Sequence, residues 1–176
     1  MKGEKDRRKG FSLVEMVIVI GIMAVLVGGI GLSIGLLRSA DTKGAAYGIN
    51  SALTNLKSRT TGGKDQPYLY LYLLNNKYHL DTSIEKPDTY TPTADSKEIG
   101  DTRVQITYGS DKKALADASG GGSDNVLCIA FRKKDGAFLV EGKCVCPEEI
   151  YVGTDNVADY VVHMVQDTGH HYIEEK

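Results

Sequence analysis

A single carboxylate stands inside the longest apolar run of the chain. Between Phe11 and Leu37 the only ionisable side chain is that of Glu15, and the next charge is Arg38. A charged side chain in a membrane segment costs roughly 2.5–3.5 kcal/mol on insertion scales, so it is usually retained for a function and has a specific partner. The chemistry expected of Glu15 is therefore the pairing of its negative charge with a cation.

The ten residues before this run are basic. Residues 1–10 carry five Lys or Arg side chains against two acidic ones, a net charge of +3, and they end in Lys9-Gly10. Behind the run, only Arg38 and Lys43 are basic and close by. By the positive-inside rule, this asymmetry predicts a cytoplasmic N-terminus and an external C-terminal bulk.

The apolar run is long enough to cross a bilayer. As a helix, its uncharged part (residues 16–37) would span about 33 Å, and the hydrocarbon core of a bilayer is about 30 Å thick. We therefore expect a transmembrane helix over residues 11–37. Gly28, Gly31 and Gly35 would let neighbouring helices approach closely, although glycine is also simply common in membrane helices.

The layout of Gly10, Phe11 and Glu15 resembles the class III signal of type IV prepilins and pseudopilins. The resemblance implies that residues 1–10 are a leader, that a prepilin peptidase cuts after Gly10, and that the new amine of Phe11 is methylated. It implies that Glu15 then pairs with the Phe11 amine of a neighbouring subunit. A simpler explanation of Glu15 is that glutamate favours a helix N-terminus. The implied partners are the peptidase, other pilin or pseudopilin subunits and the inner-membrane assembly platform.

The helical pattern continues beyond the apolar run. Apolar residues recur three or four positions apart between residues 45 and 56, and Thr60-Thr61-Gly62-Gly63 ends the pattern. We predict an amphipathic continuation of the helix over residues 38–61 and an extracellular β-rich head over residues 62–176. The expected fold class is α+β. The resemblance implies the pilin-like form of it, one long N-terminal helix packed on an antiparallel β-sheet.

The head reads as a series of strands. Residues 68–73 alternate leucine and tyrosine, so the leucines should face the helix and the tyrosines the other side. The tyrosine face is either a surface for subunits or a ligand, or simply the outer face of an amphipathic strand. Further strands are expected at residues 77–80, 103–108, 126–132, 137–140, 143–146, 149–152, 160–165 and 172–173, with loops at 85–101 and 117–125.

The three cysteines are candidates for one disulfide. Cys144 and Cys146 alternate within an expected strand, so both should face the same side, and either could pair with Cys128. The alternative is three reduced, buried thiols, because free cysteine is commonly buried.

Motifs for catalysis are missing from the sequence. It contains no phosphate loop, dinucleotide fingerprint, nucleophile elbow or HExxH motif, so we expect a protein that is not an enzyme and has no cofactor. We expect no metal either, because the three cysteines lack the CxxC spacing typical of zinc sites. The net charge is −2, and −5 without residues 1–10 (−2 minus +3), which disfavours nucleic-acid binding by direct electrostatics.

Two functions fit these observations. The first is a structural subunit, major or minor, of a type IV pilus or a type II secretion-like pseudopilus, located in the cytoplasmic membrane and then in the filament. The alternative is a single-pass signal-anchor protein whose outer β-domain binds a ligand or partner. Cleavage before Phe11 distinguishes them.

Overall fold

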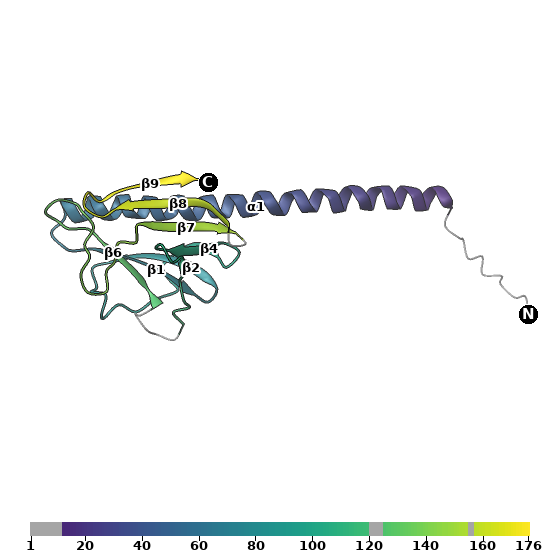
Figure 1. Cartoon of the computed structure of the whole chain (residues 1–176). Coiled ribbons are helices and arrows are strands. Elements are labelled where there is room, and N and C mark those ends of the chain that lie inside the picture. The colour runs from purple at the N-terminus through teal and green to yellow at the C-terminus, as the bar shows by residue number, and fades with distance from the viewer. Residues whose placement is uncertain (1–11, 120–124, 155–156) are drawn as a thin grey trace, which may run out of the picture. The chain divides into compact units, whose positions relative to one another are not determined.

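Helix α1 and two antiparallel sheets make up the described part of the chain (Figure 1). The computed structural model describes residues 12–119, 125–154 and 157–176. For residues 27–38 and 157 it describes the backbone but not the side chains. The chain divides into two compact units, residues 1–37 and residues 38–176. Helix α1 (Leu13–Gly62) contributes to both units, which are treated separately below.

In the second unit, α1 buries one stripe of side chains. Ala45, Ile49, Leu53 and Leu56 are fully buried, and Ala52, the fifth apolar residue of the predicted pattern, is half-buried. The helix ends where Gly63 follows it. A Cβ atom at Gly63 would lie 2.4 Å from the carbonyl oxygen of Arg59, so only glycine fits this close approach of the backbone.

Four strands form sheet A, in the order β3-β2-β1-β6, with antiparallel neighbours. Five strands form sheet B, in the order β5-β4-β7-β8-β9, also antiparallel. The strands of sheet A are β1 (Tyr68–Leu74), β2 (Lys77–Ser83), β3 (Lys97–Asp101) and β6 (Leu127–Ala130). Those of sheet B are β4 (Gln105–Tyr108), β5 (Lys113–Ala114), β7 (Glu149–Thr154), β8 (Val157–Val165) and β9 (His170–Glu175).

The fold class is therefore α+β with antiparallel sheets, as predicted, but there are two sheets instead of one. The division falls between β3 and β4, where a tight turn (Val104 N–H to Asp101 O, 3.0 Å) redirects the chain. As a result, β4 pairs with β7 and not with β3.

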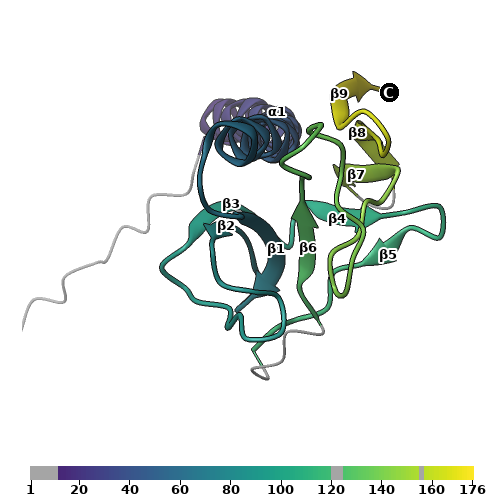
Figure 2. The ribbon, with the colours of Figure 1, turned by 90° about the vertical axis from the view of Figure 1, so that its left-hand side faces the viewer.

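One hydrophobic core joins the helix to both sheets. It combines the buried stripe of α1 with Leu69 and Leu71 from β1 and with side chains from β4, β7 and β8. In Figure 2 sheet A lies beneath this part of the helix and sheet B curves up beside it. Figure 1 shows that β8 and β9 run along the helix. The leucines of β1 thus belong to the same core as the helix stripe, as their alternation predicted.

Two of the three tyrosines of β1 are buried, so neither alternative for this face, a binding surface or the outer face of an amphipathic strand, describes it. Tyr70 and Tyr72 are 1% and 0% exposed and lie in a second cluster with Tyr90. The ring of Tyr90 stacks on that of Tyr70, with centroids 3.6 Å apart. The Tyr72 hydroxyl donates to the carbonyl of Thr93 at 2.8 Å. Residues 84–96 therefore cover this face of sheet A, and Tyr70, Tyr72 and Tyr90 are called the tyrosine cluster below.

Two other expectations differ from the structure. Residues 137–140 and 143–146 form only isolated bridges and no strand, because Gly136 and Gly142 adopt positive φ (68° and 61°) and turn the chain twice. The expected loop at residues 85–101 ends in strand β3, which pairs with β2.

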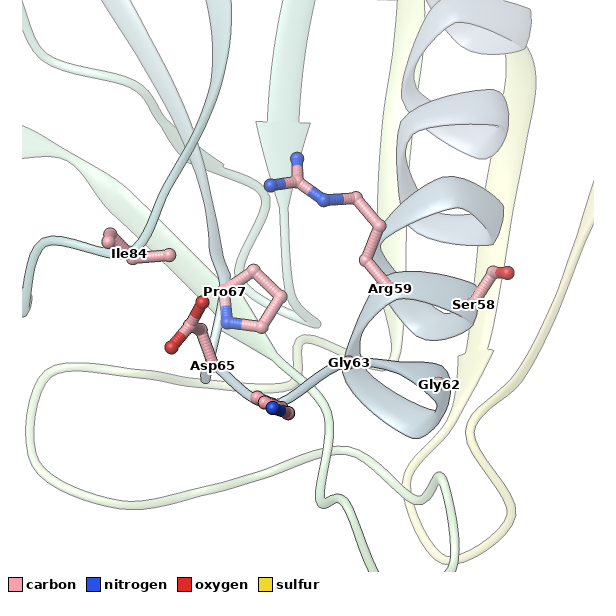
Figure 3. A pocket seen from close by; sticks show the side chains of 8 residues that line it. Ser58, Arg59, Gly62, Gly63, Asp65, Pro67 and Ile84 are labelled. Carbon is pink, nitrogen blue, oxygen red and sulfur yellow. The ribbon is translucent and has the colours of Figure 1, made fainter.

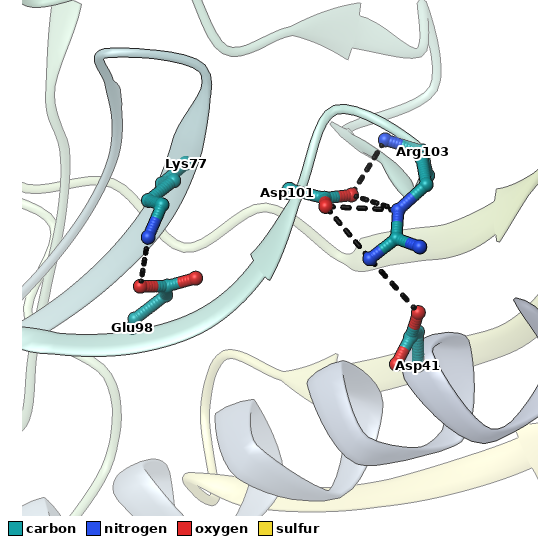
Figure 4. A network of polar contacts seen from close by, with 5 residues as sticks. All are labelled: Asp41, Lys77, Glu98, Asp101 and Arg103. Carbon is teal, nitrogen blue, oxygen red and sulfur yellow. Dashed lines mark hydrogen bonds and ion pairs between the residues drawn. The ribbon is translucent and has the colours of Figure 1, made fainter. Parts of the chain in front are cut away.

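A charged network links α1 to the corner between β3 and β4 (Figure 4). The Arg103 guanidinium lies 2.8 Å from Asp101 and 3.6 Å from Asp41 on the helix. The hydrogen bonds from Arg103 hold the pKa of Asp101 below its usual value. Because these side chains are exposed, the network contributes little to stability.

Candidate functional site at the start of helix α1

Ser12 caps the N-terminus of α1. Its side-chain oxygen accepts a hydrogen bond from the backbone N–H of Glu15 (3.2 Å), and its carbonyl accepts one from Met16 (3.2 Å). These two bonds satisfy groups that would be unpaired at a helix start. Sequence reasoning missed this role, although the signal was present: Ser-x-x-Glu before an apolar run is the capping-box pattern.

Glu15 lies in the first turn of the helix and is exposed. A carboxylate there is favoured by the partial positive charge of the helix N-terminus. The cap therefore places the one acidic side chain of the run close to the beginning of α1. Gly10 and Phe11, the predicted cleavage site, lie outside the described residues.

The described large side chains on both sides of Glu15 in the sequence are apolar and exposed all round the helix. Their exposed fractions run from 43% at Val19 to 81% at Leu13. A helix that is hydrophobic all round is normally covered, either by lipid or by other helices. This apolar segment comprises Leu13, Val14, Met16, Val17, Ile18, Val19, Ile20, Ile22, Met23, Val25 and Leu26.

Within the described residues, no helix combines the length and the hydropathy of a membrane span. Residues 27–37 of the predicted span are among those whose side chains are not described. The predicted packing glycines Gly28, Gly31 and Gly35 fall in the same stretch, so their packing stays a prediction.

A family model matches this region of the sequence. Residues 5–31 match the prokaryotic N-terminal methylation motif. The chain carries that motif. The match confirms the resemblance to the signal of type IV pilins and pseudopilins, which are structural subunits, and it includes Gly10, Phe11 and Glu15. No curated protein and no solved structure gives a significant match to the chain.

In the second unit, Cys128 and Cys144 form a disulfide, with Cα atoms 4.6 Å apart. Cys146 is a half-buried free thiol. The expectation that Cys144 and Cys146 face the same side is wrong: Cys144 lies with the tyrosine cluster, whereas Cys146 packs against the main core. Residues 143–146 are not a strand, so the alternation of a strand does not apply. Burial, with a contribution from Glu148, raises the pKa of the Cys146 thiol to about 11.

Two of the described histidines, His79 and His163, are held by neighbouring side chains. His79 is buried beside Tyr72, with its Nδ1 3.0 Å from the Ser96 hydroxyl. His163 lies between two carboxylates, 3.3 Å from Glu149 and 2.7 Å from Glu174. Among the residues that the structure describes, no group of three His, Cys, Asp or Glu side chains is arranged to hold a metal ion.

Proposed function

We propose that this chain is a prepilin or pseudopilin, a structural subunit of a type IV pilus or of a type II secretion-like pseudopilus. The observation that carries the proposal is the methylation motif at residues 5–31. The exposed apolar segment of α1 and the antiparallel α+β unit behind it support the same function.

Maturation would begin with a cut after Gly10. Glycine has no side chain, so its backbone can enter a narrow protease cleft at the membrane face. Because Ser12 caps a helix that begins at Leu13, the bond to be cut precedes the first helical residue. Cleavage would remove the +3 leader and leave a new amine on Phe11, which is then methylated.

Glu15 would set the position of each incoming subunit. In the apolar surroundings of a helix bundle, an unpaired carboxylate is strongly penalised and a paired one much less so. The Phe11 amine of a neighbouring copy supplies the matching positive charge. The pair would therefore form only when the two helices are in the correct register.

The apolar segment would be covered twice in the life of the protein. It would first lie in the cytoplasmic membrane and later against the same segment of other copies in the filament core. Gly28, Gly31 and Gly35 would allow those helices to pack closely. The head would then lie outside the membrane, and its Cys128–Cys144 disulfide fits an oxidising compartment of that kind.

Mass spectrometry and N-terminal sequencing of the protein from membranes test the processing step. We expect a chain that begins at Phe11 and carries about 14 Da of added mass for one methyl group. A Gly10→Leu variant should stay uncut, whereas Gly3→Leu, the matched change elsewhere in the leader, should be processed normally. An intact N-terminus on the wild-type chain would instead support a signal-anchor protein.

The assembly step has a separate test. Glu15→Ala should be cut and methylated but should fail to appear in a sheared surface or pseudopilus fraction. The neighbouring change Val14→Ala is the control for altered helix packing. Normal filament yield from Glu15→Ala would remove the charge pair from the proposal while leaving processing intact.

A further inference from the structure

Three segments far apart in the sequence meet where α1 ends and bring six cationic side chains together. The segments are residues 57–65, 132–136 and 166–170, called the cationic end below. They contain Lys57, Arg59, Lys64, Arg132, Lys133 and Lys134, against Asp65, Asp135 and Asp167, so the net charge is +3. Residues 11–176 carry −5 in all, which leaves −8 (−5 minus +3) for the rest.

Direct contacts hold the three segments together. Lys57 donates to the carbonyls of Thr168 and Gly169 at 3.2 and 3.1 Å. A Cβ atom at Gly136 would lie 3.0 Å from Lys57 Cε, so the turn at residues 132–136 packs on the helix. The Lys133 amine in turn donates to the carbonyl of Lys64. The clustering of charge is therefore produced by the fold.

A pocket of about 400 Å³ opens at this end (Figure 3). Arg59 and Lys64 are among its lining residues. Figure 3 shows Arg59 reaching from the helix on one side of Pro67, with Asp65 on the other side. Arg59, Lys64, Lys133 and Lys134 are exposed, and Asp135 is already paired with Arg132 at 3.0 Å. The surface available to a ligand is thus mainly cationic.

Stabilisation of the helix end does not account for all of these charges. Cations in the last turn, such as Arg59, interact favourably with the helix dipole. Lys133 and Lys134 belong instead to a separate turn, and that effect falls off within one turn of the helix. Lys133 has one structural contact, its bond to the carbonyl of Lys64. Within the described residues the exposed Lys134 makes no such bond, so its charge is left without a structural reason.

We propose that the cationic end binds the phosphodiester backbone of an anionic polymer without reading its sequence. Lys and Arg supply most of the affinity of such contacts. The apolar side chains of the pocket are Pro67 and Ile84, and a platform for stacked bases would need aromatic ones.

The test uses the full chain in detergent micelles and a short fluorescein-labelled DNA duplex of mixed sequence. Fluorescence anisotropy is recorded over a series of salt concentrations. About four phosphate contacts would weaken binding on the order of 100-fold between about 50 mM and about 200 mM salt. The double variant Lys133→Gln/Lys134→Gln should lower the salt slope by about 2, which leaves a loss of about 10-fold over the same range.

The matched control is Lys112→Gln/Lys113→Gln, which removes two adjacent exposed lysines at β5. It should leave the slope unchanged. The proposal is overturned if the duplex does not bind at low salt, or if both double variants weaken binding equally. It is also overturned if Lys133→Gln/Lys134→Gln abolishes self-association without changing duplex binding, which would assign the surface to a second copy.

Competition identifies the chemistry of the ligand. Unlabelled duplex and poly(glycerol phosphate) at equal phosphate concentration should both displace the labelled DNA, and the stronger competitor indicates the source of the polymer. Equal displacement by polyglutamate would contradict recognition of phosphodiesters. Because no readout involves residues 10–15, a negative result leaves the proposed maturation untouched.

Discussion

Reduction of the Cys128–Cys144 disulfide should lower the free energy of unfolding by about 3 kcal/mol. The two cysteines are 16 residues apart in the sequence. In the chain-entropy description, closing a loop of roughly 15 residues in the unfolded chain is worth about 3 kcal/mol at 25 °C. Both cysteines are 2% exposed, so reduction leaves two small thiols in an intact core. The expected loss of stability is therefore the entropy advantage of closing this loop in the unfolded chain.

Urea unfolding of the full chain in detergent is measured for the oxidised and the reduced protein. If the dependence of the unfolding free energy on urea concentration is the same for both, the shift in the unfolding midpoint gives the difference in stability. Cys144→Ala should unfold like the reduced protein, whereas Cys146→Ala should unfold like the oxidised one. Equal midpoints for the oxidised and reduced chains would refute the reasoning, and so would a fall caused by Cys146→Ala of the same size as that caused by Cys144→Ala.

The same structure predicts that Cys146 stays outside the disulfide. Its pKa of about 11, raised from 9.0 by burial, leaves about 100-fold less thiolate near neutral pH than an ordinary cysteine has. Since the thiolate is the form that attacks a disulfide, exchange should be slow. Peptide mapping should find Cys128 joined to Cys144, and recovery of a Cys128–Cys146 peptide would contradict this.

Two further outcomes are expected from the second unit. Tyr72→Phe should destabilise it by about 1–3 kcal/mol, because the lost hydroxyl contacts Thr93 and Ser96 at 2.8 Å; thermal unfolding beside Tyr172→Phe, an exposed tyrosine, checks this. Burial lowers the pKa of His171 from 6.5 in the folded protein, so the unfolded chain binds the proton more readily. The stability that comes from keeping His171 neutral is therefore complete above pH 6.5 and is lost as the pH falls through the lower pKa of the folded state. His171→Gln should flatten that part of the stability curve, and an unchanged curve would rule the histidine out.

The N-terminal site could be read from the sequence because its signal is local. One carboxylate in an uncharged run, preceded by Gly10 and Phe11, needs no tertiary contact to be recognised. The methylation motif confirms the resemblance that rests on these residues, and their individual roles stay predictions. The buried stripe of α1 was equally accessible, since helical periodicity alone selects Ile49, Leu53 and Leu56. Ser12 was missed although its pattern is just as local.

The errors concern positions where distant segments decide the environment. Alternation in β1 separates its two faces correctly but does not reveal that Tyr90 and the rest of residues 84–96 cover the tyrosine side. The pairing partner of Cys128 depends on turns at Gly136 and Gly142, whose positive φ ends the strand pattern. Likewise, the net charge of −5 conceals a cationic end assembled from three separate segments.

The tyrosine cluster also gives the protein an internal optical probe. The chain contains ten Tyr and no Trp, so its near-ultraviolet spectrum arises mainly from tyrosine. Tyr70 and Tyr90 stack at 3.6 Å inside a packed site, and rings held rigidly at that distance couple their electronic transitions. Near-ultraviolet circular dichroism of the unlabelled protein will therefore be weighted toward the closure of residues 84–96 over sheet A. Far-ultraviolet dichroism follows the helix and both sheets instead, so a comparison of the two signals separates release of this covering segment from unfolding of the whole head.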